Sequence, residues 1–309
     1  MRPDLNTLAL PELFTTLVDE ERLDTLLALA FEEDLGDVGD VTTSSLVSPD
    51  VTVRAAIVAR SDGIIAGLPV VERVLTSRTS DLICMLRAHD GSICQRGDVL
   101  LELHGPLALM LPLERIVLNT LGRLCGIATL TRQFVDAVTG TRAKLCCTRK
   151  TTPGWRELEK YAVRCGGGWL HRVGLYDAML VKDNHLGAVP ADQLAPAIAA
   201  AARIARCRFD LRFVEVEVDT LEQLDDVLSI EAGVIDIVLL DNFELGALRE
   251  AVRRRDARRP KLELEASGGV RLESVRAIAE TGVERISCGA ITHSAISLDV
   301  AMDLLGEVR

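Results

Sequence analysis

Aromatic residues are scarce in this sequence, at 3% of its 309 residues, and so is positive charge, with a formal net charge of -11. Proteins that bind single-stranded nucleic acid stack bases on aromatic side chains, and proteins that bind duplexes need a basic face. We therefore expect no nucleic-acid partner. A small anionic ligand remains compatible with an acidic protein if its pocket is locally positive.

The sequence also lacks the long apolar segments of membrane and secreted proteins. No run reaches the roughly 20 apolar residues that are needed to cross a bilayer. The first residues carry no apolar core followed by a small-residue cleavage site. We therefore expect neither a signal peptide nor a membrane partner.

Cysteine is present but follows no recognised pattern. The eight cysteines form no CxxC pair, and Cys146 and Cys147 are adjacent. This arrangement suits neither a disulfide framework nor a zinc site. We expect reduced thiols in a cytoplasmic protein, although Cys84 and Cys94 could face each other across a hairpin.

The first part of the chain predicts a small domain of helices and short strands. Its length and hydrophobic content of 48% are enough for one large domain or two ordinary ones. The expected helices are 1–35, 68–77 and 107–140, and the expected strands are 51–60, 81–88 and 99–103. Residues 39–43 are predicted as a polar loop, and Pro112 is expected in the first turn of the long helix.

From about residue 143 the pattern changes to strands that alternate with helices. The expected strands are 143–148, 175–182, 212–218, 235–241, 262–267 and 285–288, and the expected helices are 155–165, 191–205, 221–230, 245–255 and 272–281. Strands separated by helices imply parallel pairing. Each predicted strand ends in a polar or glycine motif, which favours a barrel over an open doubly wound sheet.

Two of these strands predict a charged barrel interior. In the segment VEVEV, Glu215 and Glu217 lie on one side of the strand and the valines on the other. If the valines contact the outer helices, both carboxylates point inward, and Glu263 and Glu265 repeat the pattern. Buried carboxylates need cations nearby. The expected partners are Lys144, Lys150 and Lys182.

Residues 147–185 gather positive charge against the acidic balance of the whole chain. The cationic residues are Arg149, Lys150, Arg156, Lys160, Arg164, Arg172 and Lys182, with His171 and His185 among them. Arginine binds carboxylates in bidentate fashion, so this stretch predicts an anionic ligand, although any single arginine could instead lie on a solvated face. His171 follows a glycine-rich turn and suits a pocket better than His89 or His104, which we expect on exposed turns.

Two carboxylates end neighbouring predicted strands. Glu217 and Asp241 could hold a hard cation such as Mg²⁺ beside a diphosphate. A salt bridge with Lys182 or Lys150 is the alternative, and both arrangements can hold if the lysine leaves when the metal arrives.

Glycine motifs follow the last two predicted strands. They are Ser267-Gly268-Gly269 and Gly289-Ala290. In barrels these positions commonly bind phosphate through backbone N–H groups. Each motif alone is typical of an ordinary turn, but their placement after consecutive final strands favours a phosphate site.

These motifs resemble the quinolinate phosphoribosyltransferases (nicotinate-nucleotide pyrophosphorylases, carboxylating). The matching segments are ER at 114–115, CGIAT at 125–129, TRKTTPG at 148–154, EKYAVRCGGG at 159–168, HR at 171–172, KDNH at 182–185, VEVEV at 214–218, LLDNF at 239–243, EASGGV at 265–270 and CGAITHS at 288–294. The resemblance spans residues 24–303.

The resemblance implies an α/β fold, an incomplete α/β barrel with an N-terminal α/β sandwich domain. The implied domains are 1–124, with 290–309 packing back on it, and the catalytic barrel 125–289. It also implies a homodimer in which each active site is completed by the N-terminal region of the partner. The implied reaction transfers the phosphoribosyl group of phosphoribosyl pyrophosphate to quinolinate with decarboxylation.

The resemblance also implies roles for particular residues. The implied quinolinate-binding residues are Arg149, His171, Arg172 and Lys182, with Arg115 lent across the dimer. The implied phosphoribosyl pyrophosphate-binding residues are Thr148, Lys150, Ser267, Gly268, Gly269, Gly289, Ala290, Ile291 and His293. Glu217 and Asp241 are the implied catalytic residues that associate with Mg²⁺, the expected cofactor.

The chain departs from the family pattern in three places. Leu170 stands where Asn is usual, Cys147 stands where Asp is usual, and 230–234 carries a few extra residues. A homologous molybdenum-transport-associated protein that acts on another base is therefore an alternative. A Schiff-base lyase that uses Lys182 or Lys150, and a non-catalytic member of the family, are the others.

Overall fold

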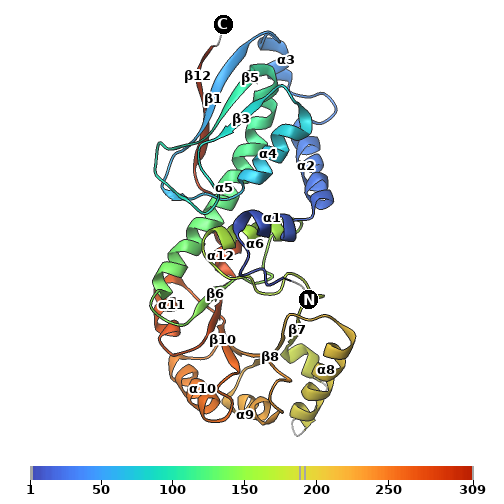
Figure 1. Ribbon diagram of the computed structural model, residues 1–309, viewed down its shortest axis with the longest axis vertical. Helices are drawn as coiled ribbons and strands as arrows, with labels where there is room; N and C mark the ends of the chain where they lie inside the picture. The colour runs from blue at the N-terminus through green and yellow to red at the C-terminus, as the bar shows by residue number, and fades with distance from the viewer. Residues whose placement is uncertain (1–2, 188, 191–192, 308–309) are drawn as a thin grey trace. The chain divides into compact units, whose positions relative to one another are not determined.

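The computed structural model describes residues 3–187, 189–190 and 193–307 (Figure 1). The chain divides into two compact units. Of the described residues, the barrel unit comprises 3–4, 133–151, 168–187, 189–190 and 193–293, and the sheet unit comprises 5–132, 152–167 and 294–307. Helix α5 (Leu107–Val138) continues without a break through residue 124, where the sequence predicted a domain boundary. The division therefore falls later in this helix, between residues 132 and 133.

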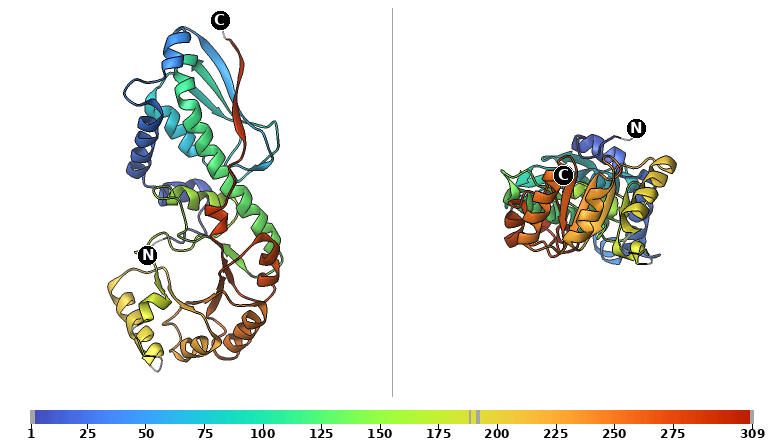
Figure 2. Two further views of the ribbon diagram at one scale, coloured as in Figure 1. Left: turned by 180° about the vertical axis from the view of Figure 1, so that it is seen from behind. Right: turned by 90° about the horizontal axis from the view of Figure 1, so that it is seen from below.

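The sheet unit is built on a four-stranded antiparallel sheet with strand order β12-β1-β5-β3. Its strands are β1 (Thr52–Ala59), β3 (Ile83–Leu86), β5 (Val99–Pro106) and β12 (Val300–Glu307). Small and β-branched residues make β1 the buried central strand. The C-terminal strand β12 pairs with β1, so the end of the chain returns to its N-terminal half. Helices α4 (Leu68–Arg78) and α5 lie beside this sheet in both ribbon views (Figures 1 and 2).

The sheet unit contains four further helices and one further pair of strands among the described residues. They are the helices α1 (Leu10–Leu17), α2 (Glu20–Leu35), α3 (Val41–Leu46) and α6 (Arg156–Cys165), and the paired strands β2 (Gly63–Ile64) and β4 (Ile93–Cys94). Cys84 lies in β3, which pairs with β5, so it does not face Cys94 across a hairpin. All eight cysteines are free thiols.

Three local predictions for this unit were wrong. Residues 1–35 do not form one helix, because Val18 is extended and Asp19 begins a new helix by accepting the N–H of Arg22 at 3.0 Å. Asp40 likewise caps α3, so the expected loop at 39–43 becomes the start of a helix. Pro112 lies inside α5, beyond its first turn, because that helix begins directly after β5.

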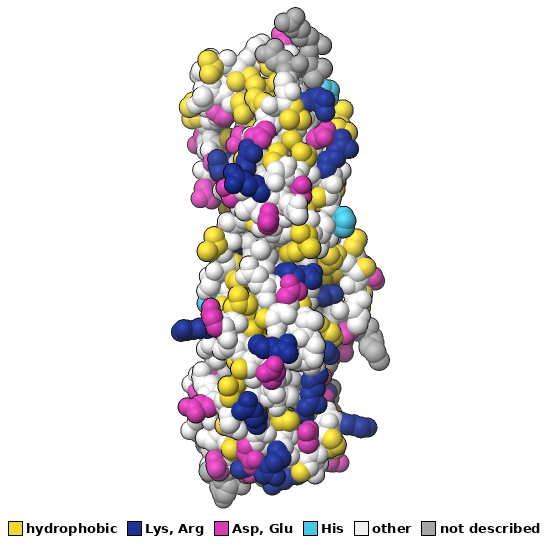
Figure 3. Space-filling model, turned by 90° about the vertical axis from the view of Figure 1, so that its left-hand side faces the viewer, with side chains coloured by type: hydrophobic (Ala, Val, Ile, Leu, Met, Phe, Trp, Pro, Cys, Tyr) yellow, Lys and Arg dark blue, Asp and Glu magenta, His cyan; other side chains and the backbone are white. Residues whose placement is uncertain are grey.

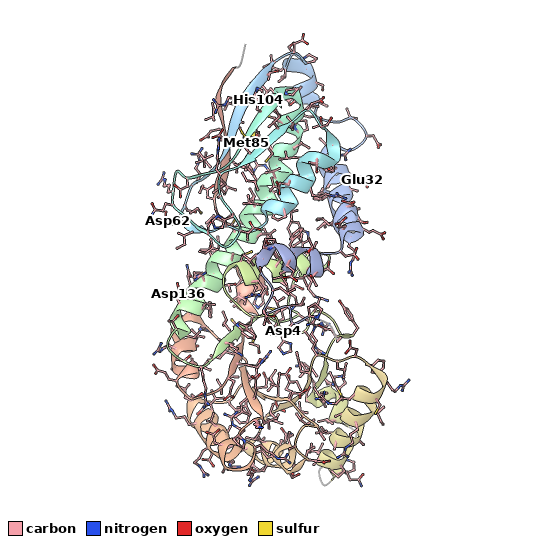
Figure 4. The ribbon with its side chains drawn as sticks, viewed as in Figure 1. Asp4, Glu32, Asp62, Met85, His104 and Asp136 are labelled. Carbon is pink, nitrogen blue, oxygen red and sulfur yellow. The ribbon has the colours of Figure 1, made fainter. Side chains whose placement is uncertain are left out.

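A fourth expectation was wrong for His104, which was placed on an exposed turn. It lies within β5, opposite Ile83 of β3, and Figure 4 shows it on the sheet near Met85. The alternation of β5 continues through Gly105 and Pro106, which the sequence suggested as the end of the strand.

The barrel unit contains six parallel strands in the order β6-β11-β10-β9-β8-β7. The strands are β6 (Lys144–Cys146), β7 (Met179–Val181), β8 (Val214–Val218), β9 (Ile237–Asp241), β10 (Glu263–Ser267) and β11 (Arg285–Ser287). Helices α8 (Leu194–Arg208), α9 (Leu221–Ser229), α10 (Leu245–Arg258) and α11 (Leu272–Ala279) lie outside them (Figure 1). All six predicted strands are present. In the described part of the chain β6 and β7 remain unjoined edges, which confirms the incomplete α/β barrel.

The strands carry their polar residues to one end because they run in parallel register. Ser267 of β10 lies opposite Asp241 of β9, so both strands end at the same level. The short helices α7 (Asp183–Leu186) and α12 (Ala290–His293) begin just after β7 and β11 at this end. Within the described ranges no helix is both long enough and apolar enough to span a membrane.

Candidate active site

Two arginines at the C-terminal end of the barrel strands lie close to each other. Arg149 follows β6, and Arg172 belongs to the segment between β6 and β7 and is only 7% exposed. Burial lowers the pKa of Arg172, and the positive charge of Arg149 lowers it further. Nε of Arg149 is buried and has no hydrogen-bond partner among the described residues. Two neighbouring cations, one of them with an unused buried donor, suit a carboxylate ligand.

The loop around Arg172 is held by its own hydrogen bonds. Its Nη1 donates to the carbonyl of Ala178 at 3.4 Å. The carboxylate of Asp177 accepts the N–H groups of Val173 at 2.9 Å and Gly174 at 3.0 Å. These contacts fix where the guanidinium lies before any ligand arrives.

The third cation of the site is paired with a carboxylate. Nζ of Lys182, just beyond β7, forms an ion pair with Glu217 near the end of β8. This is the salt bridge that the sequence left open as an alternative to a metal site. Asp241, at the end of β9, accepts a hydrogen bond from Nδ2 of Asn242 at 2.7 Å. The carboxylates expected to hold Mg²⁺ thus end neighbouring strands, as predicted.

The glycine motif after β10 is shaped by close approach to the chain after β9. Gly268 has φ +92°, and a Cβ there would lie 2.1 Å from Oδ1 of Asn242. The N–H of Asn242 donates to the carbonyl of Ser267 at 2.9 Å. Gly269 also has positive φ, at +60°, but open space around it. Only glycine fits at Gly268 without moving the backbone.

The glycine motif after β11 packs against Lys150. A Cβ at Gly289 would lie 2.9 Å from Cδ of Lys150 and 3.2 Å from Nε2 of His293. The hydroxyl of Thr292 donates to the carbonyl of Lys150 at 2.8 Å. The N–H of Lys150 in turn donates to the hydroxyl of Thr148 at 3.0 Å. Ala290 and Ile291 begin α12 here, and the side chain of Ile291 is buried.

Beneath the cations lies a buried network of charged side chains. His171 Nε2 lies 2.8 Å from Oε2 of Glu215 and 3.4 Å from Oε1 of Glu265. Nε of Arg285 donates to Oε2 of Glu265 at 2.6 Å. Both glutamates are fully buried, so their inward orientation is as predicted. Their expected lysine partners were wrong, because His171 and Arg285 take that place.

The other expected lysine and glutamate contacts also differ from the prediction. Nζ of Lys144 lies 4.0 Å from the centroid of the Trp169 ring. Lys150 packs on Gly289. Glu263 lies at the start of β10, where its side chain is 38% exposed and 3.6 Å from Nη1 of Arg285. The two ends of this short strand therefore have different access to water.

Electrostatics in the network follow from burial and proximity. Burial alone would lower the pKa of His171, but Glu265 and Glu215 raise it to about 10. Burial alone would raise the pKa of Glu265, but His171 and Arg285 lower it to about 2. Burial and the charge of Glu265 raise the pKa of Glu215.

One hydrogen bond determines where the ring of His171 carries its proton. The N–H of Arg172 donates to Nδ1 at 2.8 Å, and a proton on Nδ1 would face that N–H directly. The carboxylates that raise the pKa of His171 both lie on its Nε2 side. The carboxylates therefore favour a proton on Nε2, and the N–H of Arg172 opposes a second proton on Nδ1.

In the barrel unit, charge interactions link Arg172 to Arg149 and Glu217, and Lys182 pairs with Glu217. Two further residues of this region were missed. Arg285 was missed because it opens a short strand, yet it is the register partner of Glu265. Asn242 was read only as part of a strand end, although its positive φ of 55° marks a special backbone position. Arg115 belongs to the sheet unit, where it is exposed on α5.

The two departures from the family pattern near the site are neighbours in the barrel interior. Cys147 and Leu170 are both buried. The N–H of Cys147 donates to the carbonyl of Trp169, the residue before Leu170, at 2.9 Å. Both side chains thus belong to the packed interior beside the arginines.

Two family models match this chain. A model described as the N-terminal domain of quinolinate phosphoribosyl transferase matches residues 40–125, and one described as its C-terminal domain matches residues 127–303. The chain belongs to the quinolinate phosphoribosyltransferase family. The resemblance read from the motifs is thereby confirmed.

Relatives of known name cover nearly the whole chain. The nicotinate-nucleotide pyrophosphorylase (carboxylating) of Mycobacterium leprae is 44% identical over 279 residues, which are 89% of this chain and 94% of that protein. A probable enzyme of the same name from Bacillus subtilis is 40% identical over 283 residues, which are 92% of this chain and 93% of that protein.

Solved structures of the quinolinate phosphoribosyltransferase family share the fold. NadC from Streptococcus pyogenes matches with a TM-score of 0.85 and 34% identity, covering 94% of this chain and 99% of that one. The nicotinate-nucleotide pyrophosphorylase of Francisella tularensis matches with a TM-score of 0.83 and 33% identity, covering 93% and 97%. The two-unit architecture is therefore that of the family.

Proposed function

We propose that this enzyme transfers the phosphoribosyl group of phosphoribosyl pyrophosphate to quinolinate, with loss of CO₂. The products are nicotinate mononucleotide and pyrophosphate, and the pathway served is NAD synthesis. The observation that carries the proposal is the pair Arg149 and Arg172, two close cations with a buried donor of Arg149 unused. Two cations suit a ligand that carries two carboxylates, and the names of the relatives give the same reaction.

Quinolinate binding follows from charge neutralisation. Its two carboxylates would be bound by Arg149 and Arg172, with Lys182 as the third cation. A ligand of two negative charges removes the repulsion that lowers the pKa of Arg172. Arginine is favoured here because its planar fork matches a carboxylate.

The bond-forming step needs no protein nucleophile. The ring nitrogen of quinolinate attacks C1 of the sugar as the bond from C1 to the pyrophosphate oxygen breaks, through a transition state with oxocarbenium character. The carboxylates of Glu217 and Asp241 lie at the strand ends where a sugar cation would be stabilised. The positive charge on the pyridinium nitrogen then stabilises the electron pair that stays on C2 when the 2-carboxylate leaves as CO₂, and a proton binds to C2 in its place.

The phosphates would be bound by backbone and side-chain donors at the ends of β6, β10 and β11. The donors are the N–H groups of Gly268, Gly269, Gly289, Ala290 and Ile291, with the side chains of Thr148, Lys150, Ser267 and His293. Close packing of Gly268 against Asn242 and of Gly289 against Lys150 supports this proposal, since it holds the backbone N–H groups of both motifs in fixed positions.

Gly268→Ala is expected to raise the KM for phosphoribosyl pyrophosphate by about tenfold or more, because backbone strain costs on the order of 1–3 kcal/mol. Its Cβ would lie 2.9 Å from the backbone nitrogen of Asn242. Gly269→Ala is the matched control, with positive φ but open space. Initial rates at varied phosphoribosyl pyrophosphate measure both, and equal KM values would contradict the steric account.

The donor set at the strand ends fits Mg²⁺. Carboxylate oxygens of Glu217 and Asp241 are ligands of the kind that Mg²⁺ prefers. Bound there, Mg²⁺ would neutralise charge on the leaving pyrophosphate. Lys182 neutralises Glu217 in the absence of metal.

Removal of divalent cations is expected to abolish turnover, because the leaving group then keeps its full charge. The enzyme would be dialysed against EDTA, assayed, and assayed again after addition of MgCl₂ in excess over the substrate. Restored activity is expected with Mg²⁺ and not with NaCl at equal ionic strength. Full activity in EDTA would contradict the assignment.

We also propose a homodimer in which Arg115 of one chain completes the site of the other. Arg115 is exposed, and so are apolar side chains of the sheet unit, including Ile83 (56%), Leu304 (53%) and Leu305 (51%). Figure 3 shows hydrophobic side chains among the charged ones on the face it presents.

A mixture of inactive Arg115→Ala and Arg149→Ala chains should regain about a quarter of wild-type activity, because half of the dimers are mixed and each mixed dimer has one intact site of two. No recovery would contradict the sharing of Arg115.

The decisive assay mixes the enzyme with Mg²⁺, phosphoribosyl pyrophosphate and quinolinate labelled in its 2-carboxylate, and measures labelled CO₂. Release that requires phosphoribosyl pyrophosphate supports the proposal. Turnover of another pyridine base without turnover of quinolinate would reassign the substrate.

We further propose that the enzyme acts in the cytoplasm, where its free thiols would stay reduced.

A further inference from the structure

Asp177 is a buried carboxylate in the segment between Arg172 and β7, and it is 1% exposed. Its Oδ2 accepts the N–H of Val173 at 2.9 Å, and its Oδ1 accepts the N–H of Gly174 at 3.0 Å. These are the two residues that follow Arg172. One buried side chain therefore holds the backbone from which the next part of the site extends.

Arg212 compensates the buried charge of Asp177. Its Nε lies 3.4 Å from Oδ2 of Asp177, and its backbone N–H donates to the carbonyl of Asp177 at 2.8 Å. Its Nη1 donates to the carbonyl of Pro3 at 2.9 Å. Asp177 is thus attached through its side chain and its main chain to a residue just before β8. Such a partner matters because an unpaired charge is costly in the interior.

The turn from Arg172 to Ala178 is closed at both ends. Nη1 of Arg172 donates to the carbonyl of Ala178, the residue after Asp177, at 3.4 Å. A guanidinium on a long side chain loses much rotamer freedom when it is held in one position. The protein meets this cost before a ligand arrives, because adjacent residues hold both the guanidinium and the backbone that follows it.

Asp177 itself is unsuited to contact an anionic ligand. Its charge would repel a carboxylate, and both of its oxygens already accept backbone N–H groups. Burial lowers the pKa of Arg172 and the charge of Arg149 lowers it further, whereas Glu215, Asp177 and Glu217 oppose the shift. Any favourable effect of Asp177 on the binding of a dicarboxylate must therefore pass through Arg172.

We infer that Asp177 is a positioning residue for the proposed reaction. Its carboxylate holds the turn after Arg172, and so it fixes that guanidinium for a carboxylate of the substrate. Arg212 supplies the counter-charge that allows Asp177 to be buried there. The inference deepens the proposed function and rests on it for the identity of the ligand.

Asp177→Asn keeps the shape of the side chain and changes its hydrogen bonds. An amide has one acceptor oxygen, and its NH₂ group would face a backbone N–H, so either Val173 or Gly174 loses its acceptor. We expect the Kd of quinolinate, measured by calorimetry, to rise by about tenfold. The KM of phosphoribosyl pyrophosphate should stay within about twofold.

Asp236→Asn is the matched control. Asp236 also accepts a backbone N–H, that of Val214 at 2.7 Å, and it also pairs with an arginine, Arg206, at 2.5 Å. It lies just before β9 and holds β8 instead of the turn after Arg172. Its replacement should leave the Kd of quinolinate within about twofold. Equal losses in the two variants would overturn the inference, since any loosened strand start would then have the same effect.

A double-mutant cycle separates positioning of Arg172 from other effects. In the background of Arg172→Met, Asp177→Asn should weaken binding by less than about twofold, because the group that it positions is absent. An equal loss in both backgrounds would show that Asp177 acts independently of Arg172 and would overturn the inference. If Asp177→Asn does not fold, Arg212→Gln takes its place in the cycle, and thermal unfolding confirms that the compared proteins are folded.

Hydrogen exchange tests the inference without any ligand. In deuterated enzyme followed by NMR, exchange at the amides of Val173 and Gly174 should be at least about tenfold faster in Asp177→Asn, relative to the amide of Val238 in β9. Unchanged exchange at both amides would overturn the inference, whether or not quinolinate is the substrate. Failure of the wild-type enzyme to bind quinolinate would instead contradict the proposed function, and exchange would still decide whether Asp177 holds the turn.

Discussion

Arg149→Ala is expected to reduce kcat/KM for quinolinate by roughly two orders of magnitude, equivalent to about 3 kcal/mol or more of transition-state stabilisation. The variant removes the arginine that is proposed to bind a carboxylate of quinolinate, and that buried charge is then left without a partner. Nε of Arg149 is buried and unpaired within the described residues, so its interaction is expected to form with the ligand and not with the protein. Initial rates at saturating phosphoribosyl pyrophosphate measure the effect.

Arg142→Ala is the matched control for this prediction. Arg142 precedes β6, at the opposite end of the strand that Arg149 follows, and its side chain is 53% exposed. Its ion pair with Glu284 spans 3.3 Å in contact with solvent, so its loss should leave turnover nearly unchanged. Equal losses in the two variants would indicate a general effect on charge or folding, and near-normal turnover of Arg149→Ala would remove that residue from the site.

Glu265→Gln is expected to lower the free energy of unfolding at neutral pH by about 3 kcal/mol, because it breaks a buried ion-pair network and strands its partners. Glu265 is fully buried between His171 and Arg285. Nε of Arg285 donates to Glu265, and its Nη2 has no hydrogen-bond partner among the described residues, so the neutral amide of Gln would leave the buried charge of Arg285 uncompensated. Urea unfolding followed by circular dichroism measures the change.

The free energy of unfolding at acid pH provides a second measurement on the same variant. The network lowers the pKa of Glu265 from 4.5 to about 2. A lowered carboxyl pKa contributes stability that is fully present above pH 4.5 and is lost as pH falls toward 2. The difference between wild type and Glu265→Gln should therefore shrink over this range, and a constant difference would contradict the assigned shift.

Glu263→Gln is the control for both measurements. It lies two residues earlier on the same strand, where its side chain is 38% exposed and 3.6 Å from Arg285. Solvent screens such a pair, so the expected loss is less than about 1 kcal/mol. A loss as large as that of Glu265→Gln would mean that the strand, and not the buried pair, determines the effect.

The strands of the barrel could be predicted because their signals are local. The alternation in Val214–Val218 and the polar residue at the end of each strand are visible within a few residues of sequence. The break at Val18 and the cap at Asp40 were missed because each depends on one side chain that accepts a backbone N–H group. Such a bond competes with the hydrophobic period and leaves little trace in it.

The sequence by itself determined the family, the parallel strands and the residues at their ends, because motifs and hydrophobic periodicity are properties of the order of residues. Only the tertiary structure decided which charges meet. The register of β10 against β11 pairs Glu265 with Arg285, where lysines had been expected. The backbone N–H of Arg172 donates to Nδ1 of His171. Electrostatic interactions in a buried site change steeply with distance and access to water, and both are set when distant segments pack together.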